Sequence, residues 1–125
     1  MKTARHIRGF TLVEIMIVVA IIGMLATIAI PNFVRSRGAA QQKACISNLY
    51  QINGAINTWA TELNKGPGQA VTFNDIAPYL QNAVVCPAGG TSFDDSYSIT
   101  TVDALPTCQR QPQSHKLPPL PASTQ

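Results

Sequence analysis

The amino-acid sequence predicts an α+β protein with a long, kinked N-terminal helix and a small C-terminal head that contains a short helix and a β-hairpin. Three observations lead to this class. A membrane-length apolar run comes first, a stretch with apolar residues at helical spacing follows it, and the C-terminal part combines turn residues with an alternating segment. The 125 residues allow at most one small domain beside such a helix.

The apolar run extends from Phe10 to Ile30 and is interrupted by only three polar residues, Thr11, Glu14 and Thr27. At about 1.5 Å per residue a helix of this length can cross a bilayer core of about 30 Å. We therefore predict a membrane-spanning helix over residues 10–31. Pro31 removes a backbone donor and is expected to kink it. Removal of the run as an ordinary secretory signal peptide remains the alternative.

A second, amphipathic half of the same helix is predicted over residues 32–64. Its apolar residues follow one another at spacings of four and three, which places them on one helix face. This stripe consists of Cys45, Leu49, Ile52, Ile56, Trp59 and Leu63. Glycine and proline in "NKGPG" end the helix. We expect the stripe to be core that holds the head, with Trp59 as a packing residue.

The head is predicted over residues 65–110. Thr72 and Asp75 have the spacing of a capping box, which indicates a short helix through Leu80. The segment "CPAGG" is typical of a turn, and "SYSITTV", residues 96–102, alternates like a strand that could pair with residues 107–110. Residues 111–125 are rich in proline, and we expect a flexible tail whose role the sequence leaves open.

The charges argue against a nucleic-acid-binding protein. The net charge is +3, but Lys2, Arg5 and Arg8 all precede Gly9. Beyond Gly9, six basic residues balance six acidic ones. The basic balance therefore belongs to the first nine residues, and the remainder lacks the footprint of a phosphate-binding surface.

The three cysteines are Cys45, Cys86 and Cys108. Cys86 and Cys108 are candidates for a disulfide that staples the head, and Cys45 is expected to be a small buried apolar residue. Three reduced structural cysteines remain the alternative. We predict no zinc site and no cofactor, because the sequence contains no CxxC pair and only two histidines accompany the cysteines.

Acidic residues and catalytic patterns give little further signal. Asp94, Asp95 and Asp103 could offer oxygens to calcium, but they match no known loop pattern and a solvated turn is the simpler interpretation. Both histidines fall in predicted terminal segments, so the cysteines lack a histidine base. We therefore predict that the chain is not an enzyme.

The stretch "RGFTLVEIMIVVAIIGMLATIAIP" resembles the N-terminus of type IV pilins and of the pseudopilins of type II secretion. That family has a short basic leader, a glycine before the cleavage point, Phe-Thr-Leu-x-Glu, and an apolar stretch that ends in proline. The matching residues are Lys2, Arg5, Arg8, Gly9, Phe10, Thr11, Leu12, Glu14 and Pro31. The resemblance is close from Arg8 to Pro31.

The resemblance implies that residues 1–9 are a leader removed between Gly9 and Phe10 by a prepilin peptidase. It also implies N-methylation of Phe10 and a role for Glu14 in the register of subunits. The implied location is the bacterial inner membrane, with the C-terminal part outside the cytoplasm. The implied partners are membrane lipid, an inner-membrane assembly platform, and copies of this chain or related pilins.

The implied function is a structural subunit of a type IV pilus or a type II pseudopilus. The sequence does not separate these two filaments, or a major from a minor subunit. Two alternatives stay open. One is a DNA-uptake pilin, and the other is a single-pass anchored binding protein that does not polymerise.

Overall fold

The computed structural model describes residues 9–119 of the chain. The basic residues of the leader and residues 120–125 of the tail therefore lie outside the described residues. The chain divides into two compact units, one ending at Arg37 and the other beginning at Gly38. We describe each unit by itself.

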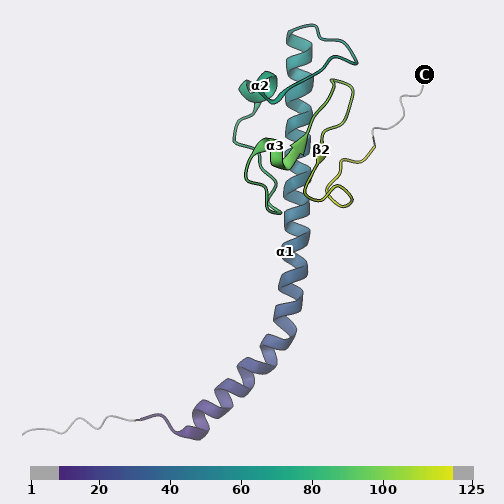
Figure 1. Ribbon diagram of the computed structural model, residues 1–125. Coiled ribbons are helices and arrows are strands. Elements are labelled where there is room, and N and C mark those ends of the chain that lie inside the picture. Colours follow the sequence, from purple (N-terminus) through teal and green to yellow (C-terminus); the bar gives the residue numbers. More distant parts are fainter. Residues whose placement is uncertain (1–8, 120–125) are drawn as a thin grey trace, which may run out of the picture. The chain divides into compact units, whose positions relative to one another are not determined.

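One helix, α1 (Leu12–Glu62), accounts for 51 residues and passes through both units (Figure 1). This confirms the long N-terminal helix predicted from the apolar run and the stripe. Pro31 lies inside α1, and the helix continues beyond it. The kink expected at Pro31 stays a prediction.

The first part of α1 presents apolar side chains on all its faces. Its large hydrophobic residues are exposed from Leu12 to Val34. Exposure on every side is unfavourable in water, so this surface requires lipid or other apolar helices around it. α1 is long and apolar enough to span a membrane.

The second part of α1 forms one wall of the head's core. The buried α1 residues are Cys45, Leu49, Ile52, Ala55, Ile56, Trp59 and Ala60. The predicted stripe is thus confirmed as core as far as Trp59. Leu63 was wrongly included: α1 ends at Glu62, and Leu63 follows it with 54% of its surface exposed.

The short helix of the head forms where the capping residues predict it. It consists of α2 (Phe73–Ile76) followed by the 3₁₀ helix η1 (Ala77–Tyr79). The Asp75 carboxylate accepts hydrogen bonds from the Thr72 amide at 2.8 Å and from the Thr72 hydroxyl at 2.6 Å. Pro78 lies within η1, where a missing amide donor is tolerated at a helix start.

The β-hairpin is present but shorter than predicted. Strand β1 (Tyr97–Ser98) pairs antiparallel with β2 (Thr107–Cys108), with Tyr97 opposite Cys108. The expected strand start at Ser96 instead closes a helical turn, α3 (Phe93–Ser96), where Ser92 accepts a hydrogen bond from the Asp95 amide. Thr101 forms only an isolated bridge with Ala70.

The segment after β2 packs against the head, so the prediction of a flexible tail is wrong for residues 111–117. His115 and Leu117 are both buried. The side-chain amide of Gln42, on α1, donates to the carbonyl of Ser114 at 2.7 Å. The segment is therefore held by the helix despite its prolines.

Candidate functional site

The N-terminal end of α1 is closed by a pair of side chains. The Glu14 amide donates to the Thr11 hydroxyl at 3.2 Å, and the Thr11 amide donates to the Glu14 carboxylate at 3.4 Å. This is the reciprocal arrangement of a capping box. The structure therefore gives Glu14 a local role at the helix start that the sequence analysis did not identify.

Capping does not neutralise the charge of Glu14. Glu14 is the only charged residue between Arg8 and Arg35, and within the described residues no basic side chain forms an ion pair with it. The hydroxyl of Thr27, by contrast, donates to the Met24 carbonyl of the same helix at 2.7 Å. Glu14 is thus the one charged group on an otherwise apolar helix surface.

The structure does not contain the predicted disulfide. The Sγ atoms of Cys86 and Cys108 lie 3.7 Å apart and both cysteines are free, whereas a disulfide would require about 2.05 Å. Instead, Cys45 and His115 lie beside them. The ligand atoms of these four buried side chains all lie within 4.8 Å of one another. We call this group the Cys–His cluster.

His115 was not identified as a neighbour of the cysteines, because residues 111–125 were predicted to be a flexible tail. Its Nδ1 atom lies 3.9 Å from Sγ of Cys86 and 4.0 Å from Sγ of Cys108. The signal available in the sequence was weak: three cysteines and one histidine beyond Gly9 provide four donors without a local spacing pattern.

Polar side chains on one face of α1 position the loop that carries Cys86. Gln41 donates to the Pro87 carbonyl at 3.1 Å, and Asn48 donates to the Val85 carbonyl at 3.0 Å. Together with Gln42, which holds the Ser114 carbonyl, they flank Cys45 at helical spacing. α1 therefore contributes one member of the cluster and orients the segments that supply two others.

Burial changes the pKa of two of the thiols in the Cys–His cluster. Desolvation raises the pKa of Cys45 to about 12 and raises that of Cys86. Two contacts favour thiolates: the Tyr97 hydroxyl lies 3.7 Å from Sγ of Cys45, and a backbone hydrogen bond from Ala88 lowers the pKa of Cys86 against that trend. The raised pKa values favour the neutral thiols of Cys45 and Cys86 unless a cation compensates their charge.

The acidic residues considered for calcium have other partners. Asp95 forms an ion pair with Arg110, and Asp103 accepts a hydrogen bond from the Gly68 amide at 2.7 Å. These contacts lower the pKa of both carboxyls. Across residues 9–119, Asp94, Asp95 and Asp103 do not form a metal-ligating group.

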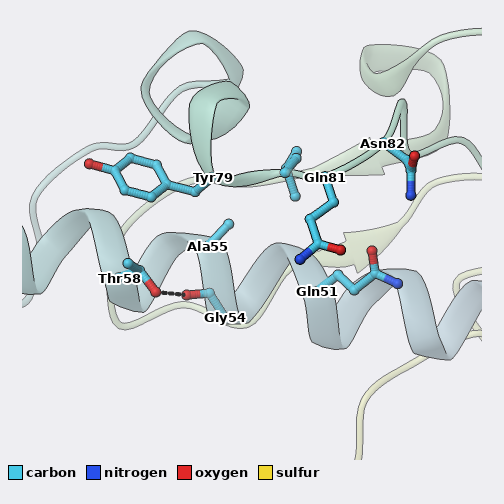
Figure 2. Close-up of a pocket in the computed structure, with 8 residues that line it drawn as sticks. Gln51, Gly54, Ala55, Thr58, Tyr79, Gln81 and Asn82 are labelled. Atoms are coloured by element: carbon cyan, nitrogen blue, oxygen red, sulfur yellow. Dashed lines mark hydrogen bonds between the residues drawn. The ribbon is translucent and has the colours of Figure 1, made fainter.

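A surface pocket of about 450 Å³ lies between α1 and the segment after η1. Figure 2 shows Gln51, Thr58, Tyr79 and Gln81 around it, with the Thr58 hydroxyl donating to the Gly54 carbonyl at 3.0 Å. Tyr79 also donates a hydrogen bond to Glu62. The lining contains no nucleophile–base pair and gives no argument for catalysis.

The fold and the N-terminal segment define a class of protein: a small head and a long helix whose first half is apolar except for a glutamate in its N-terminal capping box. The model of the prokaryotic N-terminal methylation motif matches residues 4–30. The chain therefore carries this motif and is similar to type IV pilins and type II secretion pseudopilins.

Three similar proteins illustrate the relationship. The type IV major pilin protein PilA of Myxococcus xanthus is 47% identical over 58 residues, 46% of this chain and 26% of that protein. The type II secretion system core protein G of Klebsiella pneumoniae is 35% identical over 60 residues, 48% of this chain and 43% of that protein. Fimbrial protein EcpC of Eikenella corrodens is 39% identical over 92 residues, 66% of this chain and 56% of that protein.

The chain thus aligns with between about a quarter and just over half of the length of these relatives. The relatives bear the names of structural subunits rather than enzymes. No solved structure matches the chain significantly.

Proposed function

We propose that the chain is a filament subunit, cut between Gly9 and Phe10 by a prepilin peptidase and N-methylated on Phe10. Before assembly, residues 10–31 anchor it in the bacterial inner membrane with the head outside the cytoplasm. It then polymerises through its helix with copies of itself or related pilins, on an inner-membrane assembly platform. The filament is a type IV pilus or a type II pseudopilus.

The observation that supports this most is the apolar surface from Leu12 to Val34, with a single charge near its start. Lipid and tightly packed helices can both cover such a surface, so the same helix suits storage in a membrane and packing in a filament. A plain anchor would need the apolar surface but not the carboxylate. A charged side chain within a span costs about 2.5–3.5 kcal/mol on insertion scales.

Cleavage after Gly9 would supply a partner for that charge. It creates an amine on Phe10, four positions before Glu14. In a staggered filament, the amine of one subunit can neutralise the carboxylate of its neighbour. Because the two charges are tolerable together and costly apart, the pair would specify register more than it adds stability.

The test compares Glu14→Ala with Glu14→Gln in a strain that makes the filament. Glutamine keeps the acceptor of the capping box but has no charge, so the two variants separate capping from charge pairing. We expect both variants to reach wild-type membrane levels and to lose filaments, as seen by electron microscopy. Normal filaments with both would contradict assembly through Glu14, and loss with Glu14→Ala alone would reduce its role to capping.

Two alternative functions would be recognised by other measurements. A non-polymerising anchored protein would remain in the membrane fraction and form no filament in any strain. A DNA-uptake pilin would bind DNA in a salt-dependent manner. The balanced charge beyond Gly9 argues against that binding.

A further inference from the structure

The Cys–His cluster gathers side chains from four separate places in the chain. Cys45 comes from α1, Cys86 from the loop that follows Val85, Cys108 from β2, and His115 from the segment after β2. All four are at most 5% exposed. The cluster includes every cysteine of the chain. The convergence of all three thiols with a histidine suggests that the four side chains bind one common ligand.

The spacing of the donor atoms fits a common ligand sphere. Around a tetrahedral zinc ion with Zn–S bonds of about 2.3 Å, two sulfurs lie about 3.8 Å apart, and a sulfur and a nitrogen lie about 3.6 Å apart. The Cys86–Cys108 separation is 3.7 Å, and Nδ1 of His115 is 3.9 Å and 4.0 Å from those sulfurs. All other donor pairs, including those of Cys45, lie within 4.8 Å, so movements of about 1 Å or less would close the sphere.

The donor set selects the kind of metal. Three thiolates and one imidazole form a set that soft or borderline cations prefer, whereas calcium and magnesium require oxygen ligands. Four protein donors leave no open position for water or substrate, which is the arrangement of a structural zinc site. The contacts of the Tyr97 hydroxyl with Cys45 and of the Ala88 backbone with Cys86 would stabilise the ligating thiolates.

We propose that Cys45, Cys86, Cys108 and His115 bind one Zn²⁺ that ties the head to α1. In place of a disulfide, the three thiolates and the imidazole hold this small core together through the metal ion. Binding releases the thiol protons and joins residues 86–90, β2 and residues 111–117 to the helix. This role is independent of filament assembly and concerns the folding of each subunit.

The direct test measures metal in the full chain, purified in detergent from membranes without chelators. We expect about one zinc per chain by elemental mass spectrometry. Protein loaded with Co²⁺ instead should show the intense visible bands of tetrahedral coordination together with thiolate-to-cobalt charge transfer. This spectrum is read on the unmodified chain, so it decides the question even where a variant does not fold.

Variants identify the ligands. Cys86→Ser and His115→Ala should each reduce bound zinc by at least about tenfold, since a site lacking one of four ligands is weakened severely. Ser114→Ala is the matched control, because Ser114 contacts Gln42 through its carbonyl rather than its side chain, and it should keep its zinc.

Four results would overturn the proposal or its assignment of the metal. The first is wild-type protein without zinc whose intact mass lacks two hydrogens, which would indicate a disulfide. The second is a cobalt protein without thiolate charge transfer. The third is zinc retained by folded Cys86→Ser and His115→Ala variants. Iron or copper in place of zinc would likewise overturn the assignment of the metal.

Discussion

At the scale of single residues, the turn that follows Cys86 is closely packed. The Gly90 amide donates to the Cys86 carbonyl at 2.8 Å and closes the "CPAGG" turn. A Cβ atom on residue 90 would lie 2.0 Å from the Ser96 hydroxyl oxygen and less than 3 Å from backbone atoms of Cys86. The turn expected from glycine and proline alone is thus also a site of close backbone approach, which only the folded structure reveals.

Gly90→Ala should therefore destabilise the head by about 1–3 kcal/mol, because the added methyl forces the Cys86 backbone to move. Thermal unfolding of detergent-solubilised protein can be followed by the fluorescence of Trp59, the single tryptophan, which is buried. The matched control is Gly54→Ala in α1, where a Cβ meets nothing within 4 Å.

Alanine in place of a mid-helix glycine should stabilise by about 0.5–1 kcal/mol. The close approach at residue 90 would be contradicted if Gly90→Ala unfolded at the wild-type temperature.

At the scale of elements, the second half of α1 is where the sequence predicted packing best. Helical spacing is a local property, so the stripe from Cys45 to Trp59 could be read without knowing what covers it. Its end could not, because Leu63 continues the spacing while the chain has already left the helix. The length of the strands was overestimated for a similar reason. Ser96 belongs to α3, whose local N-terminal cap competes with strand pairing.

The difference between buried and exposed positions of the predicted stripe gives a matched pair of substitutions, one inside the core and one outside it. Ile56→Ala should destabilise the head by about 2–5 kcal/mol, because Ile56 is fully buried and its removal leaves a cavity. Leu63→Ala should change the free energy of unfolding by less than about 0.5 kcal/mol, as expected for an exposed site. Equal effects in denaturant titrations would show that the buried stripe does not end at Trp59.

The cap of α2 predicts a pH dependence. Hydrogen bonds from the Thr72 side chain and backbone lower the pKa of Asp75 below its ordinary value. The stabilisation is therefore present above that ordinary pKa and is lost as the pH falls through the lower, folded-state value. Asp75→Asn should flatten the acid side of the stability curve, measured by Trp59 fluorescence. An unchanged acid limb would indicate that the carboxylate does not stabilise the cap.

For the whole molecule, the two units differ in how far sequence could predict them. The N-terminal helix and its motif are contiguous, so the apolar helix and the resemblance to pilins could be inferred from about thirty residues. The Cys–His cluster could not, because it depends on contacts such as Gln42 to Ser114, which are 72 residues apart. A proline-rich composition was read as flexibility, and the two buried side chains at His115 and Leu117 show otherwise.

The central claim is that the apolar helix becomes the N-terminus of an assembled subunit. The most direct measurement is the mass of the N-terminal peptide of the mature protein, isolated from its native membranes. We predict a chain that begins at N-methylated Phe10, with Gly9 and the residues before it removed. A mature protein that retains Met1, or one cut after the apolar run near Pro31, would contradict the account.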